Sequence, residues 1–285
     1  MAGESGLAGD AVFECKAKGV FRKDGQKPLV GDAVEMDVSD RDKRLGTIRK
    51  ILPRHSELIR PAVANVDQAL VIFSSVRPKP NFNLLDRFLI GMGRQEIPCI
   101  ICFNKQDIDG EREGEGYRRI YEKCGYRALS VSALHGEGID DLKALLADRV
   151  TVVAGPSGVG KSSIVNCLQS ETVMETGEIS AKIERGRHTT RHSELIGMGG
   201  STYIMDTPGF SAFGLFDLEK EALSGYYPEF AAFKGGCRFG GCSHTKEPVC
   251  GVKDAVAQGG ISKMRYENYC LLYEELSRTA RKGRR

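Results

Sequence analysis

The chain has 285 residues, of which 41% are hydrophobic and 28% charged, with a formal net charge of +3. This composition fits a soluble globular protein of two or three domains. A membrane-spanning helix is excluded because no apolar run reaches about 18 residues, and Met1 to Asp10 lacks a secretory signal pattern. Nine cysteines, odd in number and unevenly placed, argue against a disulfide framework. We therefore expect a cytoplasmic protein.

Basic residues concentrate near both ends of the chain. Residues 41–60 contain seven lysines and arginines against two acidic residues, and the last eight residues contain five basic ones. Such stretches are typical of proteins that meet nucleic acid. A solvated face and an unstructured tail would give the same pattern, so the two interpretations stay open here.

The first part of the chain favours β-structure. Residues 11–60 alternate short apolar runs with polar turns such as Lys23-Asp24-Gly25, which predicts three or four short strands. So few residues suit only a small barrel.

From Val66 onward, strands alternate with helices. The apolar runs predict buried strands at 66–73, 97–103, 127–131, 151–154 and 202–205, a helix capped by Asn83, and helices at about 114–123 and 139–149. This alternation predicts a parallel α/β sheet with ligands at the carboxyl ends of its strands. After Gly209 the pattern changes to a helical stretch at 211–235, a Cys/His cluster, and one amphipathic helix at 261–280.

A phosphate-binding loop follows the strand at 151–154. The motif is complete and comprises Gly155, Pro156, Ser157, Gly158, Val159, Gly160, Lys161 and Ser162, with Ser163 next in the chain. Its glycines let backbone N–H groups surround phosphates, and the following helix directs its positive end at them. We expect Lys161 to reach the β- and γ-phosphates and Ser162 to ligate Mg²⁺.

A base-recognition motif follows the strand at 97–103. Asn104, Lys105 and Asp107 form the NKxD pattern of GTPases. The carboxylate of Asp107 accepts two hydrogen bonds that guanine offers and adenine does not, and an unpaired polar group makes such rejection strong. Asn104 is expected to tie this loop to the phosphate loop. Ser132 and Ala133 are expected to place a backbone N–H at the guanine oxygen. Asp107 therefore favours GTP and disfavours a P-loop ATPase.

A metal and γ-phosphate sensor completes the set. Asp206 ends the last expected strand and begins a DxxG motif that closes at Gly209. Asp206 is expected to hold Mg²⁺ and the Gly209 N–H to contact the γ-phosphate. Between the two phosphate motifs lie Thr189 and Thr190, either of which can complete the Mg²⁺ coordination, with a slight preference for Thr190.

The order of these motifs is unusual. An ordinary GTPase runs from P-loop to DxxG to NKxD, whereas here NKxD comes first. The sequence therefore predicts one nucleotide site built from a circularly permuted chain.

The motifs leave the catalytic residue open. Ras-type GTPases carry a water-orienting Gln directly after DxxG, and this chain has Phe210. His188, a polar residue in the loop before DxxG, is a candidate, and a surface histidine is the alternative. Slow hydrolysis until a partner acts is equally compatible with Phe210.

Four metal-binding residues lie within fourteen positions near the C-terminus. Cys237, Cys242, His244 and Cys250 supply three thiolates and one imidazole, a closed set that favours one structural zinc ion. Cys99 and Cys102 also stand three apart, but an odd spacing in a strand points them to opposite faces, so both are predicted to be core thiols.

With these motifs in place, the sequence resembles the ribosome small subunit-dependent GTPase A family of bacterial circularly permuted GTPases. The resemblance covers nearly the whole chain. It rests on the phosphate loop, the metal cluster, Phe21-Arg22-Lys23 with Lys27-Pro28-Leu29-Val30-Gly31-Asp32, Ile59-Arg60-Pro61 with Val63-Ala64-Asn65-Val66-Asp67, Gly186-Arg187-His188-Thr189-Thr190, and Asp206-Thr207-Pro208-Gly209-Phe210.

The resemblance implies three domains: an OB-fold that binds ribosomal RNA over 1–61, a permuted α/β GTPase domain over 62–212, and a mostly α zinc-binding domain over 213–285. It implies hydrolysis of GTP to GDP stimulated by the small ribosomal subunit, a late role in that subunit's maturation, and catalysis by His188. Family members usually have more chain before Ala11, which puts the first barrel strand in question. We expect a monomer with no membrane partner. The alternative is an RNA-binding assembly factor that uses GTP as a latch with negligible turnover.

Overall fold

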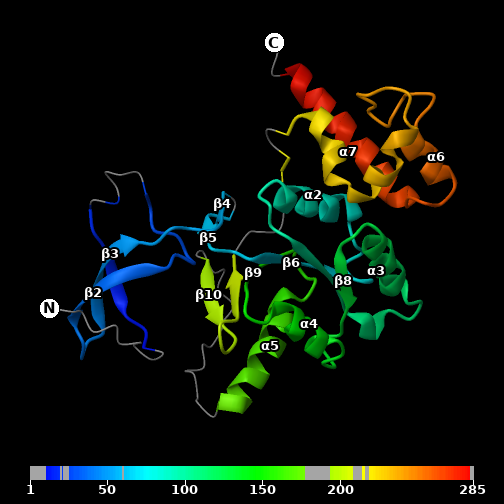
Figure 1. Ribbon diagram of the computed structural model, residues 1–285. Helices are drawn as coiled ribbons and strands as arrows, with labels where there is room; N and C mark the ends of the chain where they lie inside the picture. Colours follow the sequence, from blue (N-terminus) through cyan, green and yellow to red (C-terminus); the bar gives the residue numbers. More distant parts are fainter. Residues whose placement is uncertain are drawn as a thin grey trace. The chain divides into compact units, whose positions relative to one another are not determined.

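The computed structural model describes residues 11–19, 21, 26–59, 61–176, 193–207, 214–215 and 218–282 (Figure 1). The chain divides into two compact units, Met1–Val66 and Asp67–Arg285. Among the described residues, no helix is long and apolar enough to cross a membrane.

The first unit is built on a three-stranded sheet. Its strands β1 (Glu14–Ala17), β2 (Val34–Asp40) and β3 (Leu45–Ile51) lie in the order β1-β3-β2, with β1 parallel and β2 antiparallel to β3. The pairing of β2 with β3 shifts register twice, and such bulges bend strands. A short hairpin of β4 (Glu57–Leu58) and β5 (Val63–Ala64) follows. Four of these strands, β1 to β4, begin and end within residues 11–60, in line with the three or four predicted.

One arginine of the basic stretch at 41–60 is structural. Arg54 Nε donates to Asp32 Oδ1 at 2.7 Å, and its two other nitrogens bond Asp32, Glu57 and the Lys27 carbonyl. The side chains of Arg54 and Asp32 are 12% and 3% exposed. Arg54 therefore holds loops of this unit together, and its charge is already paired inside the fold.

The second unit contains a six-stranded sheet in the order β10-β11-β9-β6-β7-β8. Its strands are β6 (Gln68–Ser74), β7 (Cys99–Asn104), β8 (Arg127–Ser130), β9 (Val150–Ala154), β10 (Glu194–Gly197) and β11 (Tyr203–Asp206). Five strands run parallel, and β10 pairs antiparallel with β11. All seven residues of the central β6 are buried, as expected for a strand covered on both faces.

Helices cover both faces of this sheet (Figure 1). On one face, α4 (Ile139–Leu146) and α5 (Lys161–Thr176) pack on a core that includes Leu70 and Ile72. The alternate residues of β6, Val71 and Phe73, point to the other face, where Phe73 meets Phe88 of α2 (Phe82–Gly93). There α3 (Glu113–Lys123) packs Tyr121 against Phe103. The permuted sheet thus has the layers of an ordinary α/β domain.

The start of α2 differs from the sequence-based expectation. Asn81 is the N-cap residue, and its side chain accepts a hydrogen bond from the Leu84 N–H at 3.0 Å. Asn83, which was expected to cap the helix, instead accepts a bond from Arg87 within it. The extended backbone that a cap requires lies at Asn81, directly after Pro80, so the helix begins two residues earlier.

The last part of the second unit forms a lobe, here called the C-terminal lobe (residues 218–282). It contains α6 (Gly251–Ala257), the long helix α7 (Lys263–Lys282), and two 3₁₀ segments at Lys220–Tyr226 and Pro228–Gly236. The predicted helix at 261–280 is confirmed as α7. The predicted helical stretch at 211–235 is 3₁₀ where it is described, interrupted at Tyr227.

A buried polar cluster joins this lobe to α2. Arg265 of α7 pairs with Asp86 of α2 and donates from Nε to Glu229 Oε1 at 2.8 Å. Asp86 also accepts bonds from the Tyr121 hydroxyl and the Asn268 amide, each at 2.9 Å. Arg265 and Asp86 are 1% and 0% exposed at the side chain. The charges are therefore enclosed with their partners, as buried ion pairs require.

Candidate functional site

The predicted nucleotide motifs meet at one edge of the sheet. In the register of the parallel strands, Ser74 pairs with Asn104, Val71 with Ala154, and Val153 with Asp206. The carboxyl ends of β6, β7, β9 and β11 therefore lie side by side, as do the loops that follow them. This is the edge at which parallel α/β sheets bind their ligands.

Two glycines are required where the phosphate loop leaves β9 and enters α5. Gly155 has φ +142°, and a Cβ there would lie 2.2 Å from the Ile72 carbonyl oxygen. Gly160 has φ +94°, and a Cβ there would lie 2.3 Å from the Asn104 amide nitrogen. No L-side chain fits at either position. The loop can therefore lie tightly against the neighbouring strands with its helix starting at Lys161.

Lys161 is held inside the curve of the loop. Its ammonium donates to the carbonyls of Gly155 at 2.8 Å and Pro156 at 2.7 Å. Burial lowers the pKa of Lys161, and the nearby Asp206 carboxylate opposes that shift. Lys161 begins α5 and Asp206 ends β11, so two different elements bring these opposite charges to the same edge of the sheet.

The NKxD segment is bonded to three other loops. The Asn104 amide donates to the Val159 carbonyl at 2.9 Å and accepts from the Ala133 N–H at 3.1 Å. Lys105 Nζ donates to the Gly158 carbonyl at 2.8 Å and to the Arg77 carbonyl at 2.7 Å. These bonds join the base-recognition loop to the phosphate loop, to Ser132-Ala133, and to the loop after β6.

Ser132 has a contact that the sequence did not reveal. Its hydroxyl donates to Asp107 Oδ1 at 2.7 Å and accepts the His135 N–H at 3.2 Å, and the residue is fully buried. The hydroxyl therefore orients the Asp107 carboxylate, whereas only a backbone role was expected here. The Arg77 carbonyl was also missed, because a backbone acceptor leaves no mark in the sequence.

Several predicted residues lie outside the described part of the chain. They are His188, Thr189, Thr190, Gly209 and Phe210. Pro156, Ser157, Ser162 and Ser163 are described and lie in the phosphate loop or the first turn of α5.

The four predicted metal ligands come together in the C-terminal lobe. Their ligand atoms all lie within 4.8 Å of one another. His244 Nδ1 lies 3.6 Å from Cys237 Sγ and 3.4 Å from Cys250 Sγ, and the two sulfurs are 3.9 Å apart. A tetrahedral zinc site has Zn–S of about 2.3 Å and Zn–N of about 2.0 Å, which puts ligand atoms about 3.5–3.8 Å apart. The donor set and its spacing therefore fit zinc.

Hydrogen bonds around the cluster fix its loops. The hydroxyls of Tyr266 and Tyr269 on α7 donate to the carbonyls of His244 and Ser243 at 2.8 and 2.7 Å. Glu247 accepts backbone N–H bonds from residues 243, 245 and 246. Burial acts to raise the pKa of Glu247, but these hydrogen bonds lower it to about 2. The carboxylate thus closes the turn between His244 and Cys250.

The two other closely spaced cysteines behave differently. Cys99 and Cys102 lie on β7, outside the metal cluster. Burial raises the pKa of Cys99 to about 12 and that of Cys102 further still. Both are therefore uncharged core thiols, Cys102 fully buried and Cys99 in part.

The structure has a complete phosphate loop bonded to an NKxD segment, and the strand before NKxD, β7, precedes the strand before the phosphate loop, β9, in the chain. This combination defines a circularly permuted GTPase. Family comparison agrees with this class. The model of the RsgA GTPase family matches residues 51–216, and the RsgA N-terminal domain matches residues 7–48. The chain belongs to the RsgA GTPase family, and it is a GTP hydrolase with an N-terminal OB-fold domain.

Curated relatives are similar over nearly the whole chain. A protein of Agathobacter rectalis named small ribosomal subunit biogenesis GTPase RsgA is 58% identical over 94% of this chain and 89% of its own length. The protein of the same name from Ruminiclostridium cellulolyticum is 46% identical, with coverage of 93% and 87%.

Two solved structures share the fold. YjeQ from Thermotoga maritima superposes with a TM-score of 0.75 at 34% identity, covering 92% of this chain and 89% of its own. YloQ, described as a circularly permuted GTPase, superposes with a TM-score of 0.76 at 36% identity, with coverage of 97% and 90%.

Proposed function

We propose that the protein binds GTP at the carboxyl edge of its sheet and hydrolyses it to GDP on the small ribosomal subunit, late in that subunit's maturation. The observation that carries the proposal is the Asn104 side chain, which joins the base-recognition loop, the phosphate loop and Ser132-Ala133. The curated relatives' name, small ribosomal subunit biogenesis GTPase, supports the choice of partner.

We assign the base-recognition role to Asp107, oriented by the Ser132 hydroxyl. Guanine offers this carboxylate two N–H donors, so an adenine base would leave it unpaired. Lys105, held over the loop by the Gly158 and Arg77 carbonyls, covers the base with its stem. The Ala133 N–H, which donates to Asn104 Oδ1, would exchange that acceptor for the guanine oxygen.

We assign the phosphates to the backbone of Gly155–Gly160, to Lys161 and to the start of α5. When phosphates bind, the Lys161 ammonium exchanges its two loop carbonyls for phosphate oxygens. Ser162, Asp206 and Thr190 would hold Mg²⁺, which neutralises negative charge on the phosphates when bound. The Gly209 N–H is assigned to the γ-phosphate and His188 to the orientation of water, on the sequence pattern alone.

We propose that Cys237, Cys242, His244 and Cys250 hold one structural zinc ion. The four donors form a closed set, so the ion would stabilise the lobe and take no part in hydrolysis. We further propose a cytoplasmic monomer whose OB-fold domain, over residues 1–61, binds ribosomal RNA, with the GTPase domain over 62–212 and the zinc domain over 213–285.

The test of this function is GTP turnover measured with and without purified small subunits. We expect the subunit to raise turnover at least tenfold, and His188→Ala to remove that rise while leaving the Kd for GTP unchanged. Lys161→Ala is the control that loses nucleotide binding itself. Equal turnover with and without subunits would contradict the proposal.

A second candidate function rests on Phe210, which stands where Ras-type enzymes carry a catalytic Gln. In this alternative the protein is an RNA-binding assembly factor that uses GTP as a conformational latch. Binding to the subunit that depends on GTP, with turnover that the subunit does not raise, would favour it.

A further inference from the structure

The helix that follows the phosphate loop carries a cysteine that contacts the base-recognition side of the candidate site. Cys167 lies on α5, the helix that begins at Lys161. Its thiol donates a hydrogen bond to the Ala133 carbonyl, with 3.0 Å between Sγ and the oxygen. Ala133 is the residue whose N–H we assign to the guanine oxygen. The thiol therefore acts on the loop that reads the base, although it belongs to the helix assigned to the phosphates.

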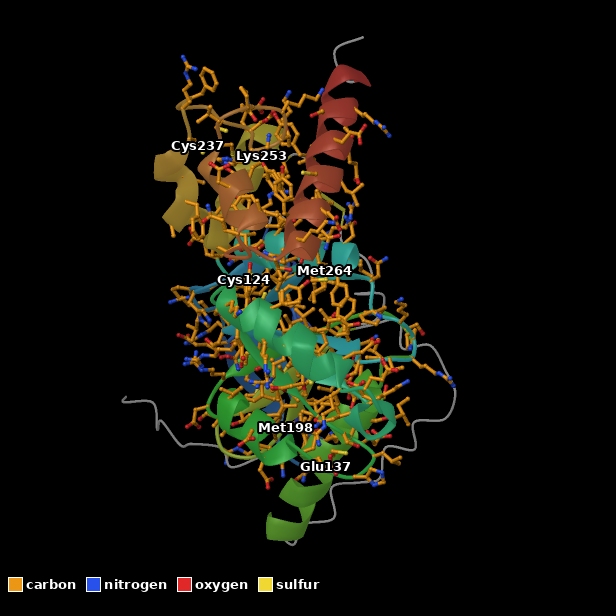
Figure 2. All side chains as sticks on the ribbon, turned by 90° about the vertical axis from the view of Figure 1, so that its right-hand side faces the viewer. Cys124, Glu137, Met198, Cys237, Lys253 and Met264 are labelled. Carbon is orange, nitrogen blue, oxygen red and sulfur yellow. The ribbon has the colours of Figure 1, made fainter. Side chains whose placement is uncertain are left out.

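This contact lies at the border of the core on the face of the sheet that α4 and α5 cover. Cys167 and Ala133 are both partly buried, and both pack against the core cluster that includes Leu168 of α5. Figure 2 shows Glu137, which forms a backbone bridge with Ser132, on the side of the sheet away from the C-terminal lobe. A hydrogen bond in such partly apolar surroundings is stronger than one in water.

The thiol is the sole described donor to the Ala133 carbonyl. Ala133 lies outside the helices and strands, and in the part of the chain that the structure describes no backbone N–H of a turn or loop donates to this oxygen. A partly buried polar group that loses its partner costs free energy. Removing the thiol would thus release the carbonyl side of this loop.

Ala133 is held through both of its polar groups. Its N–H donates to Asn104 Oδ1 at 3.1 Å, and its carbonyl accepts from Cys167. The first contact is the one that a guanine oxygen would replace. The second is made to a helix and does not involve the ligand. The thiol therefore keeps Ala133 in place when its N–H changes partner.

Two other hydrogen bonds join the base-recognition side of the site to the phosphate loop. Asn104 donates to the Val159 carbonyl and Lys105 to the Gly158 carbonyl. Both bonds start from the NKxD segment, whereas the bond of Cys167 starts from α5 and ends in the segment after β8. The Cys167 bond is thus the one of the three that acts directly on Ala133.

We propose that Cys167 is a positioning residue for guanine recognition. Its thiol holds Ala133 so that the N–H meets the oxygen at position 6 of guanine, and it does not touch the nucleotide itself. The proposal rests on the proposed function, because it requires GTP at the carboxyl edge of the sheet. A residue that only filled space in the core would have no such effect on the base.

The test compares the equilibrium binding of three nucleotides to the full-length protein. GTP has the oxygen at position 6, and 6-thio-GTP replaces it with sulfur, a weaker acceptor. Inosine triphosphate keeps the oxygen but lacks the amine that we assign to Asp107. The preference for GTP over 6-thio-GTP therefore measures the Ala133 contact, and the preference for GTP over inosine triphosphate measures the Asp107 contact.

In Cys167→Ala we expect the preference for GTP over 6-thio-GTP to fall about threefold, the scale of one weak hydrogen bond. The preference for GTP over inosine triphosphate should change less than about twofold, because the Asp107 contact is independent of the thiol. Cys167→Ser retains a hydroxyl donor and should keep both preferences. Cys102→Ala is the matched control, since it removes a buried thiol from the same core cluster. It should lower the Tm and leave both preferences unchanged.

The proposal fails if Cys167→Ala keeps the full preference for GTP over 6-thio-GTP, even with weaker binding of all three nucleotides, which is the result of a packing defect alone. It also fails if Cys102→Ala reproduces the effect, or if Cys167→Ser loses as much preference as Cys167→Ala. Failure of the proposed function would look different, because the wild-type protein would then bind GTP no more tightly than ATP.

Discussion

The nucleotide edge of the sheet and the junction of the C-terminal lobe with α2 are both rich in polar groups, yet they are stabilised in opposite ways. At the edge, Asn104, Lys105 and Lys161 donate to backbone carbonyls of neighbouring loops. At the junction, the charged side chains of Arg265, Asp86 and Glu229 meet one another. The donors at the edge can exchange their backbone carbonyls for ligand atoms. The charged groups at the junction are already paired with one another.

This difference matches two requirements of the second unit, a site that can rearrange and a helix junction that stays fixed. Loops bonded through neutral carbonyls can rearrange around phosphates at modest cost, because each such hydrogen bond contributes only about 1–3 kcal/mol. A buried ion pair holds one geometry, since losing either partner leaves a charge in a medium that cannot solvate it. The lobe is thus fixed to α2 firmly, and the nucleotide site stays adaptable.

The largest effect is expected from removing a metal ligand. Cys250→Ala should abolish stoichiometric zinc binding and unfold the lobe, because metal binding supplies much of the folding free energy of such sites, on the order of 10 kcal/mol in small zinc domains. GTP affinity should change less than threefold, since the described contacts of the nucleotide edge do not involve the lobe. Metal analysis and hydrogen exchange of α7 measure this. Cys270→Ala, outside the cluster, is the matched control and should keep its zinc.

The next effect concerns the buried ion pair. Arg265→Met should destabilise the protein by about 3–5 kcal/mol, because it leaves the carboxylates of Asp86 and Glu229 buried without a counter-charge. Urea denaturation gives the change in the free energy of unfolding. A loss below about 1 kcal/mol would show that the junction is not held by this pair.

A smaller effect on stability but a large one on binding is expected at Gly160. In Gly160→Ala the new Cβ would lie only 2.3 Å from the Asn104 amide nitrogen. The clash should separate the base-recognition loop from the phosphate loop. We expect GTP affinity to fall at least tenfold. Gly116→Ala, inside α3 where a Cβ meets nothing within 4 Å, should keep affinity and raise stability by up to about 1 kcal/mol. Unchanged GTP binding in Gly160→Ala would contradict the role of this contact.

The smallest effect on stability is expected at Arg87, the residue after Asp86. Arg87 also pairs with α7, through Glu275, but the Glu275 side chain is 50% exposed. Arg87→Met should therefore cost only about 0–1 kcal/mol, although it removes a link between the same two helices. A cost equal to that of Arg265→Met would mean that burial does not explain the strength of the junction.

Much of the candidate nucleotide site could be predicted as one cluster of loops because its signals are local. The phosphate loop, NKxD and the metal cluster each lie within fourteen residues of sequence. A parallel sheet also places the loops that follow its strands, here the phosphate loop and NKxD, at one edge. The strand β10 was missed because its four residues, Glu194–Gly197, show too short an alternation to stand out. The cap at Asn81 was misplaced at Asn83 because two asparagines stand two residues apart, and only the backbone distinguishes them.

The junction could not be predicted because its partners are far apart in the chain. Asp86 and Arg265 are 179 positions apart in the sequence. Each lies in a helix, where a single charged residue is usually interpreted as part of the solvent-exposed face. Asp86 does interrupt the apolar face formed by Leu85, Phe88 and Leu89, which is the one sequence signal of a buried partner. Which residue pairs with Asp86 depends on how α7 packs against α2, and no local sequence pattern predicts that packing.

The protein assembles one guanine-nucleotide site with its base-recognition segment ahead of its phosphate segment in the chain. Equilibrium binding of GTP and xanthosine triphosphate to Asp107→Asn is the sharpest test of this arrangement. We predict that GTP affinity falls at least tenfold and that xanthosine triphosphate binds more tightly than to the wild-type protein, because the amide now offers a donor where guanine needs an acceptor. Undiminished GTP affinity in Asp107→Asn would contradict it.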